Sequence, residues 1–421
     1  MAEQMKSSGI DWIKDIPSSW EINKVKYLAT EPGTLFLDGD WIESDVIEES
    51  GIRYLTTGNV GAGFYKEQGS GYISEKTFSE LHCLNVYPGD LMISRLNEPI
   101  GRSCIIPDTE SRYVVAVDNV VLRPNANYNK KFIMYGMNAD GYAEHANMIA
   151  RGATMSRISR SQLGQFWLAF PNIEEQQAIA DFLDKECAQI DSIAADLEKQ
   201  IALLQQYKKS LITETVTKGL DKSVPMKDSG VEFFGKIPAH WKVSKTKYVA
   251  DISIGLVTTM TANYVDEDGV PLIRNSNIRT NHIDDNGMVY LSKEFAKANI
   301  GRALHKGDIV TVHTGDVGTS AIINETYHMS HGFATIISRL KTKTVNNQFL
   351  CWLYNSEIFK EMSIAYSTGD GRQNLNLYDF VDFYILIPTL KEQMEIVNWL
   401  NLKCTEIDNF IENKQQQLLL I

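Results

Sequence analysis

The sequence repeats itself along almost its whole length, and this repeat limits the possible folds more than any other feature. Residues 9–20 read GIDWIKDIPSSW, and residues 230–241 read GVEFFGKIPAHW. Later matches follow in the same order with a nearly constant offset: Lys24 and Lys245, Gly89-Asp90 and Gly307-Asp308, Glu175-Gln176 and Glu392-Gln393, Cys187 and Cys404. Chance does not produce that many ordered matches. The chain therefore consists of two copies of one unit, each close to half of the 421 residues.

The duplication is compatible with more than one function. A chain of this length exceeds one compact core and suits two or three domains. Two similar copies predict pseudo-twofold symmetry, and because DNA is itself pseudo-twofold, two readers in tandem suit two half-sites. A duplicated scaffold that binds no nucleic acid would carry the same repeat.

A long helix is predicted after the globular part of the first copy. Residues 173–218 contain no Pro or Gly, and as a helix they would be roughly 65 Å long. Glu174 and Glu175 suit the positive end of the helix dipole, and Gly219 is a candidate C-cap. Apolar residues recur mostly at spacings of three, four and seven, as in a coiled coil: Ile179, Leu183, Ile190, Ile193, Leu197, Ile201, Leu204 and Leu211.

The second copy repeats this apolar seam from residue 389 and stops at Ile421, so we expect a shorter second helix. An apolar seam needs a partner, and two helices of one duplicated chain pack most simply against each other in antiparallel orientation. The predicted helix–helix interface sets four residues of the first helix against four of the second: Leu183, Ile190, Leu197 and Ile201 against Leu400, Ile407, Ile411 and Leu418.

The remaining parts predict α+β domains with a twisted mixed or antiparallel sheet. Short β-branched and aromatic segments bounded by Gly, Asn and Pro are typical of strands: residues 90–95, 113–122, 308–313 and 333–340. Helical patterns are few: residues 129–137, 142–149, 346–355 and 357–366. We therefore expect a globular domain over residues 1–172, a central long helix over 173–220, a second globular domain over 221–388 and a distal long helix over 389–421.

The formal net charge of −12 argues against a nucleic-acid partner, but the distribution of charge matters more than its total. Asp and Glu are absent from residues 119–139, 145–173 and 326–356, which carry Arg and Lys instead. These stretches could form basic surfaces on an acidic protein. For any single stretch, solvated loops are the simpler interpretation.

No catalytic constellation is found in the sequence. It lacks a phosphate-binding GxxxxGK[ST] loop, an HExxH pair and a GxSxG nucleophile elbow. His313, His328 and His331 have no histidine counterparts in the first copy, so we expect no metal site. The five scattered cysteines argue against a disulfide framework or structural zinc and favour a reducing cytoplasm. Neither a membrane span nor a signal peptide is expected.

The ordered set of motifs resembles the DNA-specificity subunit of type I restriction–modification enzymes, and the resemblance covers essentially the full chain. The first copy carries IPSSW at residues 16–20, PGDL at 88–91 and FWLAFPNIEEQ at 166–176. The second copy carries IPAHW at 237–241, KGDI at 306–309 and FYILIPTLKEQ at 383–393. Each motif is weak alone, but the set occurs in order and twice.

The resemblance implies a function. The two globular domains would be target-recognition domains, each reading one half of a split DNA sequence. The two helices would pair and act as a ruler for the gap between the halves, and would dock two adenine methyltransferase subunits. Those subunits would hold S-adenosylmethionine, so no cofactor is expected in this chain. Motor-nuclease subunits would join for restriction, and this chain would itself catalyse nothing.

Three loops in each copy offer the side chains that read base edges and bind phosphates. In the first copy the candidate DNA-binding residues are Thr57 and Asn59, then Arg95, Asn97 and Arg102, then Thr154, Ser156, Arg157 and Arg160. In the second copy they are Arg274, Asn275 and Asn277, then the loop after residue 312, then Arg372, Gln373 and Asn374. For the matched pair Asn59 and Asn277, a structural turn is as good an interpretation as a base contact.

Two other functions stay open at this point. A duplicated coiled-coil adaptor without DNA specificity would bind only protein. An enzyme with an unrecognised site, such as a self-contained nuclease, would cleave DNA by itself.

Overall fold

The computed structural model describes residues 4–69, 71–96, 99–150, 156–258, 260–266, 268–369 and 373–421. Contacts within the chain divide it into two compact units, Met1–Asp191 (unit 1) and Ser192–Ile421 (unit 2). The boundary falls within the long helix α5 (Ile173–Lys218), which both units share. Each unit has its own hydrophobic core.

Unit 1 is built on a four-stranded antiparallel sheet in the order β4-β10-β7-β8, beside a three-stranded sheet β6-β5-β9 in which β5 and β9 are parallel. Two-stranded pairs β1-β2 and β3-β11 complete it. The strands are β1 Met5–Ser7, β2 Asp15–Pro17, β3 Glu21–Lys24, β4 Leu35–Asp38, β5 Ile52–Leu55, β6 Tyr72–Ile73, β7 Leu91–Ser94, β8 Ser103–Ile105, β9 Tyr113–Val115, β10 Asn119–Arg123 and β11 Trp167–Phe170; the helices before α5 are α1 Glu75–Glu80, α2 Lys130–Met137, α3 Asp140–Ile149 and α4 Arg160–Gly164.

Unit 2 repeats this plan with an antiparallel sheet β15-β24-β21-β22 and a mixed sheet β16-β20-β17-β23. Its strands are β12 Met226–Asp228, β13 Lys236–Pro238, β14 Lys242–Lys245, β15 Ala250–Ile254, β16 Tyr264–Val265, β17 Val270–Arg274, β18 Ile278–Arg279, β19 His282–Ile283, β20 Val289–Leu291, β21 Ile309–Val312, β22 Ser320–Ile322, β23 His331–Phe333, β24 Thr335–Leu340, β25 Ser367–Thr368, β26 Asn374–Leu375 and β27 Tyr384–Ile387; its helices are α6 Thr246–Val249, α7 Lys293–Ala298, α8 Asn347–Tyr354, α9 Glu357–Ala365, α10 Leu377–Phe380 and α11 Leu390–Leu419.

The central strands are buried on both faces, which explains their continuous apolar sequences. In β7, Leu91 and Ile93 join the core beneath α2, whereas Met92 points to the core on the opposite face. In β21, Ile309 and Val310 separate in the same way. The side-chain alternation of a strand thus feeds two cores at once.

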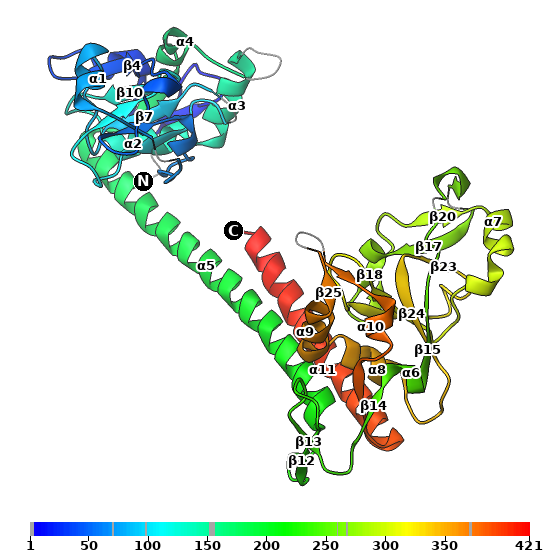
Figure 1. Ribbon diagram of the computed structural model, residues 1–421. Coiled ribbons are helices and arrows are strands. Elements are labelled where there is room, and N and C mark those ends of the chain that lie inside the picture. Colours follow the sequence, from blue (N-terminus) through cyan, green and yellow to red (C-terminus); the bar gives the residue numbers. More distant parts are fainter. Residues whose placement is uncertain are drawn as a thin grey trace. The chain divides into compact units, whose positions relative to one another are not determined.

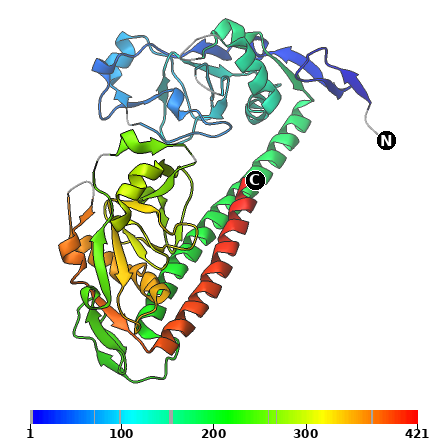
Figure 2. The same ribbon diagram turned by 90° about the vertical axis from the view of Figure 1, so that its right-hand side faces the viewer.

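The two long helices lie side by side in unit 2. Figures 1 and 2 both show α11 (red) along the later part of α5 (green). The expected fold class, α+β with two tandem globular parts and long helices, is confirmed, and so are the helices expected near residues 129–137 and 346–355. The single strand expected over residues 113–122 is wrong, because a turn divides it into β9 and β10.

Candidate nucleic-acid interface

The matched asparagines Asn59 and Asn277 shape the first candidate loop of each unit. Asn59 Oδ1 accepts a hydrogen bond from Thr56 N at 2.8 Å, and its Nδ2 donates to the carbonyl oxygens of Lys66 and Gln68. Asn277 makes the equivalent three bonds, beginning with Arg274 N at 3.1 Å. Both side chains are buried. The geometry supports the structural-turn interpretation, so we no longer expect either to contact a base.

Arg95 and Arg102 also have internal roles, and their contact with DNA stays a prediction. Arg95 is 5% exposed and donates to the carbonyl oxygens of Ile158 and Val117. Burial lowers the pKa of Arg95, and the Asp38 carboxylate, 3.1 Å from Nε, opposes this effect. Arg102 donates to four carbonyl oxygens. A guanidinium whose donors bond internal groups in this way has fewer donors left for guanine.

These internal bonds bring the three predicted loops of unit 1 together. Arg102 bonds the carbonyl oxygens of Thr57 and Val60 and so joins the loop after β5 to the β7–β8 connection. The backbone N of Ile158 donates to the carbonyl of Arg95, which attaches the third loop. The predicted residues Asn97 and Thr154 lie outside the described residues.

The equivalent loops of unit 2 also meet. Asn275 Nδ2 donates to the carbonyl of Thr314 at 3.3 Å, joining the first loop to the second. Gly315 N donates to the carbonyl of Gln373, and Thr314 Oγ1 donates to Asn374 Oδ1, joining the second to the third. Arg274 donates to the carbonyl of Gly287. Arg372 lies outside the described residues.

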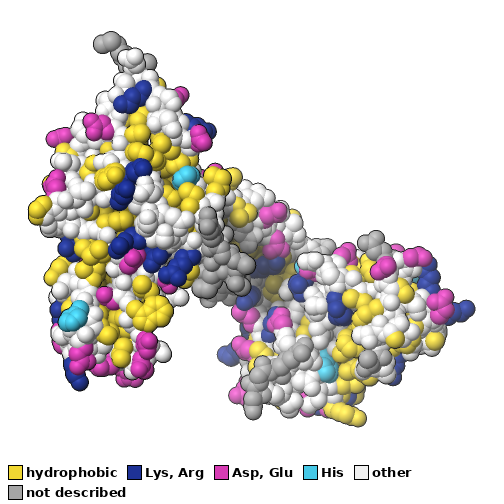
Figure 3. Space-filling model, turned by 90° about the horizontal axis from the view of Figure 1, so that it is seen from above, with side chains coloured by type: hydrophobic (Ala, Val, Ile, Leu, Met, Phe, Trp, Pro, Cys, Tyr) yellow, Lys and Arg dark blue, Asp and Glu magenta, His cyan; other side chains and the backbone are white. Residues whose placement is uncertain are grey.

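The predicted side chains that still reach solvent differ between the units. Arg157 forms an ion pair with Asp118 at 2.6 Å, and Arg160 with Asp38 at 3.4 Å, yet both arginine side chains are at least 40% exposed. Gln373 offers a neutral amide and is half-buried, as are Thr57 and Ser156. Figure 3 shows several Lys and Arg side chains gathered on the upper face of unit 1, which is also the end where Figure 1 shows α4.

Sequence reasoning missed two features of this region. The first is Asp38 and Asp118, whose carboxylates position Arg157 and Arg160. The second is a recurring basic–aromatic cluster: Lys24 Nζ lies 4.8 Å from the ring centre of Trp167, and Lys245 Nζ lies 5.4 Å from that of Tyr384. The repeat carried the signal for the second feature, because Lys24 matches Lys245. No such signal marked the acids.

The Gly-Asp motif fixes the start of the central strand below these loops. Asp90 is 2% exposed and accepts two hydrogen bonds from Arg123, at 2.9 and 2.6 Å, and Asp308 accepts the same pair from Arg339. The Asp90 carboxylate raises the pKa of Arg123. The preceding Gly89 has φ +79°, which explains the glycine.

The Trp and Glu-Gln motifs attach each long helix to its globular part. Trp241 Nε1 donates to Glu392 Oε1 at 3.2 Å, and Trp20 donates to Glu175 in the same way. Burial alone would raise the pKa of Glu392, but hydrogen bonds from His240, Thr389 and Trp241 outweigh it and lower the pKa. Motifs that lie far apart in each copy thus meet at the start of a helix.

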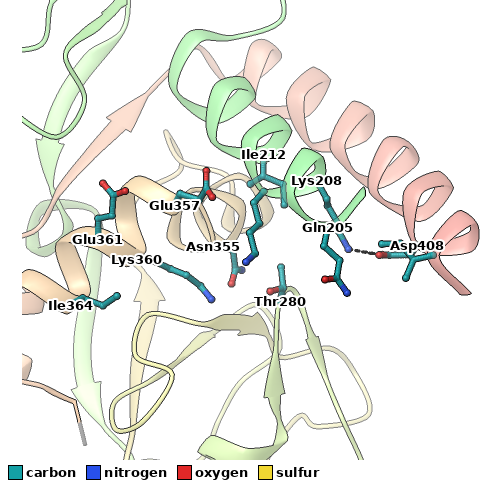
Figure 4. Close-up of a pocket in the computed structure, with 12 residues that line it drawn as sticks. Gln205, Lys208, Ile212, Thr280, Asn355, Glu357, Lys360, Glu361, Ile364 and Asp408 are labelled. Atoms are coloured by element: carbon teal, nitrogen blue, oxygen red, sulfur yellow. Dashed lines mark hydrogen bonds and ion pairs between the residues drawn. The ribbon is translucent and has the colours of Figure 1, made fainter. Parts of the chain in front are cut away.

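The helix pair has a defined register. Lys208 Nζ lies 2.6 Å from both carboxylate oxygens of Asp408. The dashed line in Figure 4 marks this interaction. Lys414 Nζ donates to Gln200 Oε1 at 2.5 Å. A cavity of about 510 Å³ lies where α5 and α11 meet α9, and the Lys208–Asp408 pair lines it. We assign this cavity to the junction between the helix pair and the globular part of unit 2.

This register corrects part of the predicted interface. Ile421 lies seven residues beyond Lys414, whereas Ile190 lies ten residues before Gln200 and Leu183 earlier still. The two helices are antiparallel, so the register sets neither Leu183 nor Ile190 against the described part of α11, and Ile190 is 45% exposed. Leu400 joins the core with α8. The other predicted interface residues are buried or half-buried: Leu197, Ile201, Ile407, Ile411 and Leu418.

Two further findings concern the described part of the chain only. No group of three or more His, Cys, Asp or Glu side chains there could hold a metal ion. None of the helices that the structure describes combines the length and hydropathy of a membrane span.

The chain has two α+β units, each with three joined loops and an anchored long helix. This arrangement is that of a recognition protein with two binding domains. The family model of the type I restriction modification DNA specificity domain matches residues 20–203 and 238–419. The chain belongs to this family. The prediction of a specificity subunit rather than an enzyme agrees with the description of the family and with the names of its relatives.

Relatives of similar sequence carry names that agree with this family. The EcoBI specificity subunit of Escherichia coli is 26% identical over 275 residues, covering 64% of this chain and 58% of the relative. A putative MjaX specificity subunit of Methanocaldococcus jannaschii is 25% identical over 355 residues, covering 82% and 78%. The chain thus spans about three fifths of the EcoBI subunit but more of the MjaX subunit.

Two solved structures share the fold. A chain from work on complex assembly and conformational transition of the type I R-M system has a TM-score of 0.70 at 12% identity, covering 96% of this chain and 95% of that chain. The HsdS subunit from Thermoanaerobacter tengcongensis has a TM-score of 0.56 at 13% identity, covering 96% and 92%. At these identities the likeness concerns the fold alone.

Proposed function

We propose that this chain is the sequence-recognition subunit of a type I restriction–modification complex and reads a bipartite DNA target, one half per unit. Its partners are double-stranded DNA, two adenine methyltransferase subunits and motor-nuclease subunits. The methyltransferase subunits hold the S-adenosylmethionine, and the chain itself contributes recognition, not chemistry.

One observation carries this proposal: the same three loops meet in both units, on the same asparagine-centred turn, but they present different side chains. Unit 1 presents Arg157 and Arg160, whereas unit 2 presents Gln373. Arginine pairs best with guanine, and glutamine with adenine. A common scaffold with different contact residues is what two different half-sites require.

The helices have a second part in the proposal. Each starts at a buried Gln and a Trp–Glu hydrogen bond, so its direction is tied to the globular part before it. A helix fixed in this way can serve as a ruler for the gap between the half-sites. Its exposed positions also offer a surface to partner subunits.

The test is co-expression of the full chain with the methyltransferase encoded beside it, followed by mapping of methylated adenines across the host genome. We expect methylation at one split motif. Gln373→Ala should relax one half of that motif and Arg157→Ala the other, because each removes contacts to one half-site only. Glu80→Ala, an exposed change on α1, serves as the control and should alter neither half.

Either of two results would contradict the proposal. One is a methyltransferase that is competent with another specificity subunit but methylates no motif with this chain. The other is a motif whose two halves relax together in both loop variants.

A further inference from the structure

The same surface pocket occurs once in each unit. In unit 1 it has a volume of about 700 Å³ and lies between the β1–β2 turn, α3, α4 and the start of β11. In unit 2 it has a volume of about 490 Å³ and lies between the β12–β13 turn, α9, α10 and the start of β27. These elements correspond one to one in the repeat, so the pocket belongs to the duplicated plan.

The turn at one side of the pocket is built identically in both units. Ser8 N donates to the carbonyl of Lys14, and Ser229 N donates to that of Gly235, both at 2.9 Å. The next residue in each turn is a glycine with φ near +70°. The turn is thus a fixed wall of the pocket in both units.

The aromatic lining also recurs. Three positions are aromatic in both pockets: Trp12 and Phe233, Phe166 and Phe383, Trp167 and Tyr384. Apolar side chains stand exposed at the rim, where Met148 is 77% exposed in unit 1 and Tyr378 is 89% exposed in unit 2. Large apolar side chains that gather at a pocket mark a binding site more often than single exposed ones.

The rim carries acid in both units. Asp11 of unit 1 matches Glu232 of unit 2, and both line the pocket. Unit 1 has Gln162 where unit 2 has Asp379, and Gln165 where unit 2 has Asp382, which is ion-paired with Lys245 and Lys247. Glu144 and Lys14 also line the pocket of unit 1. Aromatic walls with a carboxylate at the rim suit an apolar side chain that is followed by Lys or Arg.

We propose that this recurring pocket docks the methyltransferase subunit, one copy per unit, by receiving an apolar side chain flanked by a basic residue. The inference rests on the proposed function. A partner that binds twice needs the same surface twice, and the DNA-facing loops do not provide one because their side chains differ between the units. The pocket provides such a surface, because its aromatic walls, its turn and its acidic rim recur in both units.

The test measures how many methyltransferase subunits bind the full chain without DNA. The double variant Glu232→Lys with Tyr378→Ala should raise the dissociation constant of one of the two binding events about tenfold or more. Asp11→Lys with Met148→Ala should weaken the other, and the combined variant should weaken both. Matched changes away from the pockets, Glu80→Lys with Trp41→Ala and Glu294→Lys with Ile300→Ala, should leave two equivalents bound. Titration calorimetry with native mass spectrometry gives affinity and stoichiometry.

A second measurement does not depend on the stability of these variants. A photoreactive residue in place of Tyr378, in the otherwise unchanged chain, should cross-link to the methyltransferase subunit. Absence of the methyltransferase subunit from the cross-linked products would overturn the inference.

The outcomes separate the two proposals. If the wild-type chain binds two methyltransferase subunits and the pocket variants bind them equally well, the pocket inference fails and the proposed function stands. If the wild-type chain binds none, the proposed function itself fails. Pocket variants that lose DNA affinity without the methyltransferase would make DNA the occupant and also overturn the inference.

Discussion

At the residue scale, the repeated motifs are explained by buried polar groups that bond to one another. Gln393 is fully buried: its Nε2 donates to the carbonyl oxygens of Thr344 and Pro388, and its Oε1 accepts from Asn346 N. Gln176 makes the equivalent bonds in unit 1. A shorter side chain would leave these backbone groups unpaired and without water.

We expect Gln393→Ala to lower the free energy of unfolding of unit 2 by about 2 kcal/mol, because three hydrogen bonds to buried groups are lost. Calorimetry of the full chain should show the transition of unit 2 shifted to lower temperature. Gln416→Ala, at an exposed position of α11, is the control. Equal melting profiles for the two variants would contradict the assigned role.

Residue types alone could not tell DNA contacts from scaffold at the candidate site. Arg95 and Arg102 have the guanidinium groups that guanine recognition needs, but both are engaged by carbonyl oxygens that only the fold brings near. For Asn59 and Asn277 the repeat left a structural turn and a base contact equally open, and the burial and hydrogen bonds of both side chains favour the turn. The same argument leaves Arg157 and Gln373 as the better candidates.

At the scale of elements, periodicity predicted the helices well and their register poorly. The apolar seam of α5 and the lack of Pro and Gly predicted its extent almost to the residue. A seam with spacings of three and four looks alike at every turn, so it does not fix which turns face each other. Single polar pairs, Lys208–Asp408 and Lys414–Gln200, define that register and are invisible to periodicity.

We expect Leu197→Asp to disrupt the pairing of α5 with α11, because Leu197 is 8% exposed and a buried, unpaired carboxylate is costly. The variant should have a larger hydrodynamic radius and lose target-specific methylation in the co-expression assay. Ala202→Asp adds the same charge at an exposed position of α5 and should change neither. Wild-type size and methylation for Leu197→Asp would contradict this role of the helix pair.

At the scale of the whole molecule, the duplication predicted the architecture because each copy must repeat the same core. The net charge of −12 does not identify the partners, because the acid is spread over many surfaces and ion pairs such as Arg157–Asp118 are local. The repeat could not predict at which positions the two copies carry different charges, because each difference is a single substitution within the same fold.

One such difference concerns the order of assembly. The pocket of unit 1 is lined by Asp11, Glu144 and Lys14, whereas that of unit 2 is lined by Glu232, Asp379 and the Asp382–Lys245 ion pair. The pocket of unit 2 is therefore the more acidic one and the better site for a basic side chain. With the methyltransferase limiting, we expect a half-loaded species to accumulate with its single subunit on unit 2. Cross-linking from each pocket followed by mass spectrometry would detect it, and equal occupancy would contradict it. Such a species would modify one strand of each target and leave the other bare, which makes the cellular supply of the partner a control on complete protection.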